Sequence, residues 1–86
     1  MKAVDELHLN GIKVYASDMK ADKSIADVDF KEPCAIVLGS EEKGVYPALM
    51  KICDEKISIP MKGDFESLNV SVATGIILYE AMKQRF

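Results

Sequence analysis

The chain has 86 residues, which is enough for one small domain over residues 1–86 but too few to bury a large core. Its formal net charge is −3, from 14 acidic and 11 basic residues, whereas an isolated nucleic-acid-binding domain normally carries a basic face. The longest apolar stretch contains Ser71, Thr74 and Gly75 and is too short to span a bilayer. We therefore expect a soluble domain with no membrane association.

Cysteine and histidine are scarce. Cys34 and Cys53 both have apolar neighbours, and the N-terminus has no secretion signal, which predicts two buried, reduced thiols in a cytoplasmic protein. The single histidine, His8, forms no ligand cluster with them, so we expect no metal site and give His8 no role. Without a disulfide or a metal, oligomerisation remains as the way to add buried surface.

The first part of the chain predicts a helix, a strand and a loop. Apolar residues recur at helical spacing over 2–9, and Gly11 stands where the glycine that ends a helix is expected. Residues 12–16 are largely alternating and rich in β-branched and aromatic types, which is typical of a strand. The polar stretch 17–32 predicts a loop with one helical turn at 24–28.

The second part predicts strand, helix and strand. Residues 35–38 form a continuous apolar run ended by Gly39, which is typical of a strand buried on both faces of a parallel sheet. Pro47 fits the first turn of a helix that runs to about Cys53. Residues 56–59 predict a further strand.

The last element is a helix from Ser67, placed as its N-cap, to Arg85. Strands that alternate with helices indicate an α/β fold, a parallel sheet covered by helices. Three strands make a thin sheet, so we expect the chain to be part of a larger domain.

The last helix is apolar on almost every side. A helix of this kind must be buried all round, and the small residues Ser71, Ala73 and Gly75 would let another helix approach closely. Either a missing part of the same domain or a second copy of the chain would cover it. We favour a homodimer through this C-terminal helix, and both arrangements can hold together. The apolar residues are Val70, Val72, Ala73, Ile76, Ile77, Leu78, Ala81 and Met82.

Three loops are expected to lie where ligands bind. In an open α/β sheet this is outside the carboxyl ends of the strands, which points to residues 16–18, 39–44 and 60–67. Glycines bracket the second loop, although a tight turn alone would explain them. The second loop is neither a dinucleotide-binding glycine motif nor a phosphate-binding P-loop.

Two of these loops carry motifs that resemble a known family. Residues 35–44 are similar to the second motif of the SpoU (TrmH-type) family of SPOUT-class RNA ribose 2'-O-methyltransferases. Residues 57–61 together with 67–73 are similar to the third motif. The continuation 78–85 looks most like members that methylate a guanosine ribose in large-subunit ribosomal RNA. Paired motifs in this order and spacing are highly specific.

The resemblance implies the C-terminal portion of an α/β trefoil-knot (SPOUT) methyltransferase domain. It implies an S-adenosylmethionine-dependent enzyme that acts on rRNA or tRNA and forms a homodimer through its last helix. It also implies that the cofactor is bound largely through backbone groups. The cofactor-binding residues carried over in this way are Ala16, Ser17, Gly39, Ile59, Met61, Leu68 and Asn69.

By the same resemblance, Glu41, Ser67 and Asn69 are the catalytic candidates, polar groups able to orient the substrate. A helix N-cap alone would also explain Ser67, and a solvated loop would explain Glu41. Two departures matter. Glu42 stands where the family often has glycine, and the family's first motif, with its Asn and Arg, is absent. The alternative is a non-catalytic, dimerising S-adenosylmethionine-binding module.

Overall fold

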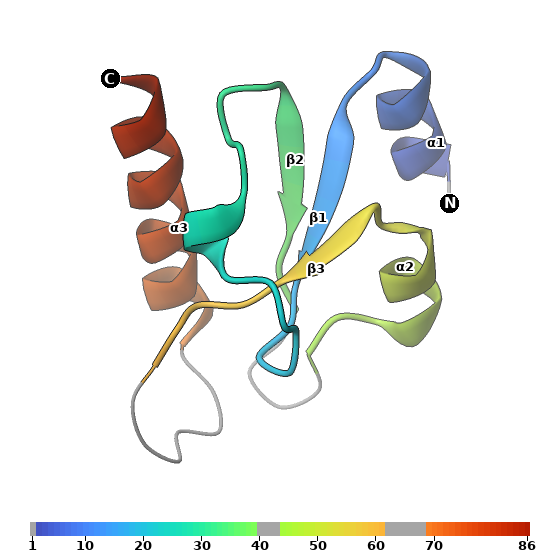
Figure 1. Cartoon of the computed structure of the whole chain (residues 1–86). Coiled ribbons are helices and arrows are strands. Elements are labelled where there is room, and N and C mark those ends of the chain that lie inside the picture. Colours follow the sequence, from blue (N-terminus) through green and yellow to red (C-terminus); the bar gives the residue numbers. More distant parts are fainter. Residues whose placement is uncertain (1, 40–43, 62–68) are drawn as a thin grey trace.

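The computed structural model describes residues 2–39, 44–61 and 69–86, and within these ranges the fold is α/β. Three parallel strands, β1 (Lys13–Ser17), β2 (Cys34–Val37) and β3 (Glu55–Ile57), form one sheet in the order β2-β1-β3. Figure 1 shows α3 on one side of this sheet and α1 and α2 on the other. The predicted parallel sheet covered by helices is confirmed.

The buried strand is β1 rather than β2. Val14, Tyr15 and Ala16 are 0–3% exposed, because β1 has a hydrogen-bonded neighbour on each edge. All four residues of β2 are only half-buried, since β2 pairs with β1 alone among the described strands. The prediction that residues 35–38 are buried on both faces is therefore wrong for the part of the chain that the structure describes.

The first helix and the loop after β1 follow the prediction. α1 (Lys2–Leu9) ends in a Schellman turn, in which the Ile12 amide donates to the Leu7 carbonyl at 3.0 Å. Gly11 has a φ of +72° there, a conformation that glycine adopts without strain. The expected helical turn is a 3₁₀ helix, η1 (Ile25–Asp27), capped by the Ser24 hydroxyl.

The boundaries of α2 agree with the prediction, and the start of α3 does not. α2 (Pro47–Ile52) starts with its proline as expected and ends one turn before β3 begins. α3 (Val70–Arg85) starts later than predicted, because its N-cap is Asn69 and not Ser67. The Asn69 Oδ1 atom accepts a hydrogen bond from the Ser71 amide at 2.8 Å, which satisfies one of the free N–H groups of the first turn.

The core lies between the sheet and α3. Phe30, Ile57 and Ile77 are at most 1% exposed, and the Phe30 ring meets that of Tyr15 edge-on at a centroid distance of 5.9 Å. Edge-to-face pairs of this kind add to the burial energy of the two rings.

Both cysteines are free, as expected, but they are half-buried rather than buried. Burial raises the pKa of each thiol, and the Cys53 thiol donates to the Leu49 carbonyl at 3.2 Å. Within the ranges given above, no helix has the length and apolar character needed to cross a bilayer. The trefoil knot implied by the resemblance depends on residues 40–43 and 62–68, which lie outside the described residues, and it stays a prediction.

Candidate cofactor-binding site

The carboxyl ends of the three parallel strands meet at one edge of the sheet, at the bottom of Figure 1. The Asp18 amide, just after β1, donates to the Ile57 carbonyl at the end of β3 at 2.9 Å. In the register of the sheet, Ser17 lies opposite Ile57, and Ala16 opposite Val37. The predicted loops at residues 16–18, 39–44 and 60–67 therefore start side by side.

Ala16 and Ser17 have different access to this edge. Ala16 is fully buried, so its methyl group is part of the sheet packing. Ser17 is half-buried and is the last residue of β1. A ligand at this edge would meet the side chain of Ser17 and not that of Ala16.

Gly39 is held close to the returning chain. A Cβ atom built on Gly39 would overlap the backbone of Gly44 and Val45, so no other residue fits there without a shift of the main chain. Gly44 has a φ of +68°, and Val45 is 7% exposed. The close approach of the Gly44–Val45 backbone explains the glycine at position 39 without a ligand.

Residues after β3 are held by the loop after β1. The Ser58 amide donates to the Lys23 carbonyl at 2.8 Å, and the Ile25 amide donates to the Ser58 carbonyl at 2.9 Å. Ile59 is half-buried against the hydrophobic core, and Met61 is half-buried too. This pairing fixes the direction in which the chain leaves β3.

Asn69 is exposed, and its side-chain carbonyl acts as the α3 N-cap. The capping role that the sequence suggested for Ser67 therefore belongs to Asn69. Glu41, Ser67 and Leu68 lie outside the described residues.

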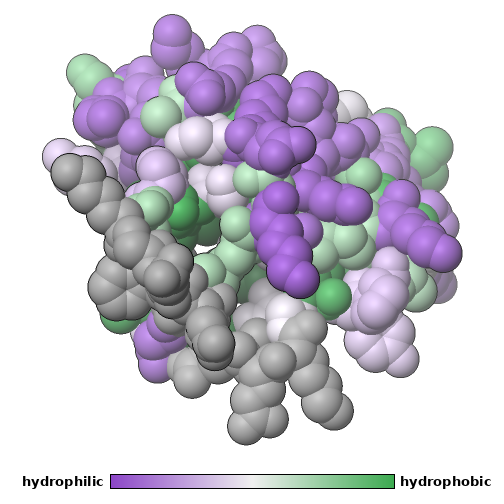
Figure 2. All heavy atoms as spheres, turned by 60° about the horizontal axis from the view of Figure 1, so that its bottom comes forward, coloured by the Kyte–Doolittle hydropathy of each residue, from purple (hydrophilic) through white to green (hydrophobic). Residues whose placement is uncertain are grey.

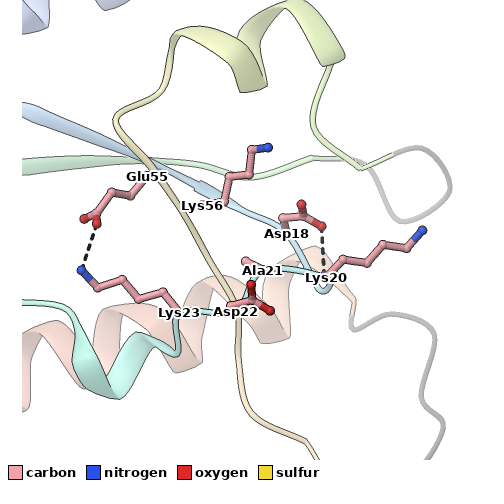
Figure 3. A pocket seen from close by; sticks show the side chains of 7 residues that line it. All are labelled: Asp18, Lys20, Ala21, Asp22, Lys23, Glu55 and Lys56. Atoms are coloured by element: carbon pink, nitrogen blue, oxygen red, sulfur yellow. Dashed lines mark hydrogen bonds and ion pairs between the residues drawn. The ribbon is translucent and has the colours of Figure 1, made fainter.

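A polar hollow of about 400 Å³ adjoins this edge and was missed by sequence reasoning. In Figure 3 the Lys23 side chain points toward Glu55, and their Nζ and Oε1 atoms are 3.0 Å apart. Lys20 points away from that pair, and its amide donates to the Asp18 side chain at 3.0 Å. The hollow is lined by Asp18, Lys20, Ala21, Asp22, Lys23, Glu55 and Lys56.

The hollow has three ammonium and three carboxylate groups, so its formal charges cancel. Figure 2 views the molecule from the carboxyl-end side and shows hydrophobic residues between strongly hydrophilic ones. Such a face suits a ligand with both apolar and polar parts better than a plain anion. The hollow was hidden in the sequence because its residues come from two segments that are far apart in the chain and are brought together by the pairing of β1 with β3 and by the Ser24–Ser58 bridge.

Comparison with solved structures identifies the class of protein to which this fold belongs. Solved RNA-modifying enzymes share the fold: the *Aquifex aeolicus* TrmH/SpoU tRNA modifying enzyme matches with a TM-score of 0.88 and 44% identity, over 98% of this chain and 43% of that chain. The SpoU methyltransferase AviRb from *Streptomyces viridochromogenes*, solved in complex with the cofactor AdoMet, matches with a TM-score of 0.88 and 37% identity. That match covers 99% of this chain and 34% of that chain.

The family follows from the sequence matches. Residues 1–79 match the model of the SpoU rRNA Methylase family, and the chain belongs to this family. It is 47% identical to the tRNA (guanosine(18)-2'-O)-methyltransferase of *Aquifex aeolicus* over 93% of this chain and 38% of that protein. It is 42% identical to the 23S rRNA (guanosine-2'-O-)-methyltransferase RlmB of *Ralstonia nicotianae* over 98% of this chain and 34% of that protein. The chain thus spans little more than a third of the length of these relatives.

Proposed function

We propose that this chain is the S-adenosylmethionine-binding and dimerising part of an RNA ribose 2'-O-methyltransferase. The reaction moves a methyl group from S-adenosylmethionine to the 2'-hydroxyl of a nucleotide in rRNA or tRNA, in the cytoplasm. The observation that carries the proposal is the match of residues 1–79 to the SpoU rRNA Methylase family. Relatives named as tRNA and 23S rRNA 2'-O-methyltransferases support the substrate class.

The residues at the carboxyl edge of the sheet suit this cofactor. Half-buried Ile59 and Met61 offer apolar surface for an adenine ring or a methionine chain. Ser17 offers a hydroxyl, and Gly39 brings its backbone to the same edge. We propose that Ala16, through its backbone, and Leu68 complete this set with Asn69.

Bound S-adenosylmethionine supplies an electrophilic methyl group on its sulfonium. A ribose hydroxyl is a weak nucleophile, so the protein's task is to align the oxygen and help remove its proton. We propose that Glu41, Ser67 and Asn69 orient the substrate or its partners. For Asn69 this role comes in addition to the N-cap bond to Ser71.

The homodimer is supported by the open surface of α3. Of its sixteen residues only Ala73 and Ile77 are buried. A Cβ atom on Gly75 would meet nothing within 4 Å, so another helix could approach closely there. The exposed apolar side chains are Val72, Ile76, Leu78, Tyr79 and Met82.

The runner-up, a non-catalytic S-adenosylmethionine-binding module, has less support, because the relatives are named as methyltransferases. A transfer assay separates the two. The protein that carries this chain is incubated with radiolabelled S-adenosylmethionine and rRNA or tRNA transcripts, and label in RNA is counted. If the protein is an active methyltransferase, label should appear in RNA. The labelled nucleotide is then mapped, and a 2'-deoxy substitution at that nucleotide should abolish the labelling. Cofactor binding without any labelled RNA would favour the module.

A further inference from the structure

The C-terminal end of α3 is bonded to the main chain of residues 28–32. The Phe30 amide donates to Gln84 Oε1 at 2.7 Å, and Gln84 Nε2 donates to the Val28 carbonyl at 2.9 Å. One side-chain amide thus exchanges two hydrogen bonds with the backbone, as a neighbouring strand does.

Arg85 continues the same pattern. Its Nε atom donates to the Phe30 carbonyl at 2.8 Å, and its Nη2 atom lies 3.4 Å from the Glu32 carbonyl. Gln84 therefore bonds the Val28 carbonyl, and Arg85 bonds the carbonyls of Phe30 and Glu32. Residues 28–32 form a bend and a turn rather than a strand, so Gln84 and Arg85 supply hydrogen-bond partners to backbone groups that lie outside the sheet.

We call the bonds from Gln84 and Arg85 to residues 28–32 the clamp. The clamp matters because little else sets the orientation of α3. A helix takes its rotation about its own axis from an apolar stripe that faces the core. α3 has apolar side chains on nearly all sides, and Val72, Leu78 and Met82 remain more than half exposed. Ala73 and Ile77 are buried and Ala81 packs against the core, which is a narrow stripe made mostly of small side chains. Such a stripe defines the rotation of the helix only weakly.

The segment that the clamp grips is anchored in the core and leads to the ligand edge. Phe30 is fully buried and packs on Tyr15 in the central strand. Residues 28–32 then continue into β2, which ends just before Gly39. The clamp therefore ties α3 to the strand that leads to a candidate cofactor loop.

We propose that Gln84 and Arg85 are positioning residues that set the rotation and axial position of α3. Through the rigid helix they place Asn69, about 24 Å away along sixteen residues, beside the other strand ends. The importance of that end of the helix rests on the proposed function, whereas the clamp itself does not.

The test is amide hydrogen exchange and chemical shift, measured by NMR in the protein. Gln84→Met keeps the length of the side chain and removes both of its hydrogen bonds to residues 28 and 30. We expect the protection of the Phe30 amide to fall about tenfold, the effect of one lost hydrogen bond, and the Ser71 and Ala73 resonances to shift. Arg85→Met removes the bonds to the Phe30 and Glu32 carbonyls, so it should give the same pattern more weakly. It keeps the test available if Gln84→Met does not fold.

Val4→Ala is the matched control. Val4 is buried on α1, so its truncation lowers global stability without touching α3. It should raise exchange across the chain and leave the Ser71 shift in place. The proposal is overturned if the clamp variants expose the Phe30 amide while the start of α3 stays unchanged, or if Val4→Ala moves Ser71 equally. Neither readout needs the cofactor, so a failure to bind S-adenosylmethionine would count against the proposed function alone.

Discussion

His8 and Asp54 are 46 positions apart in the chain, yet His8 Nε2 lies 2.8 Å from Asp54 Oδ2. The same carboxylate oxygen accepts a hydrogen bond from the Val14 amide at 2.7 Å, and the Asp54 amide donates to the Val14 carbonyl at 2.8 Å. One aspartate thus joins the end of α1, the middle of β1 and the start of β3. His8, for which the sequence analysis assigned no role, has a structural one.

Asp54→Ala should lower the free energy of unfolding by about 1–3 kcal/mol, because it leaves the Val14 amide without its acceptor in a fully buried residue. His8→Ala removes only a partly exposed partner and should cost at most about 1 kcal/mol. Urea unfolding of both variants measures the difference. Equal losses would mean that the contact with α1, and not the backbone bond, dominates.

Stability should also fall in acid through this carboxylate. The hydrogen bond from the Val14 amide holds the pKa of Asp54 below its ordinary value. Partial desolvation opposes this shift, and the contact with His8 adds to it. A lowered folded-state pKa gives stability that is fully present above the unfolded value, near 3.8, and is lost as the pH falls through the folded value.

The comparison is between wild type and Asp54→Asn, which cannot titrate. Between about pH 5 and about pH 2, wild type should lose more unfolding free energy than the variant. Parallel pH profiles would show that Asp54 does not contribute.

Gly39→Ala should destabilise the protein by about 3 kcal/mol or more, because the new methyl group would overlap the Gly44–Val45 backbone. Gly75→Ala is the matched control: its Cβ would enter open space on a helix, and alanine should stabilise by about 0.5–1 kcal/mol. Thermal unfolding at low protein concentration compares the two. A mild effect at Gly39 would contradict the close approach of the two chain segments.

Leu78→Asp should prevent dimerisation through α3 without unfolding the chain, since this side chain is 54% exposed in the monomer. Tyr46→Asp is the control, because Tyr46 is 71% exposed and precedes α2 instead. Sedimentation equilibrium should show a dimer for wild type and Tyr46→Asp and a monomer for Leu78→Asp. A wild-type monomer at all concentrations would refute the dimer.

Local patterns predicted much of the fold. The Gly11 turn, the proline at the start of α2 and the order of strands and helices all follow from neighbouring residues. The pattern could not tell which strand is central, since burial of β1 depends on pairing with β2 and β3. The prediction of Ser67 as the N-cap was wrong, because Asn69 caps α3 and both residue types cap helices well.

The site was predicted in part. The three loops start at one edge, as the rule for parallel sheets requires. The clamp of Gln84 and Arg85 on residues 28–32 and the hollow at Lys23 and Glu55 join segments far apart in the chain. No periodicity or motif in a single sequence signals such long-range side-chain bonds.

The central claim is that this chain binds S-adenosylmethionine at the carboxyl edge of its sheet. Isothermal titration calorimetry of S-adenosylmethionine into wild type, Asn69→Ser and Asn69→Ala tests it most directly. Asn69→Ser keeps a helix-capping oxygen and loses the amide, so it separates capping from ligand contact. We expect saturable binding by wild type and weaker binding by both variants. Equal affinities in wild type and Asn69→Ser would remove Asn69 from the site. A folded wild-type protein that shows no binding of S-adenosylmethionine, either as heat or in a competition titration, would contradict the account.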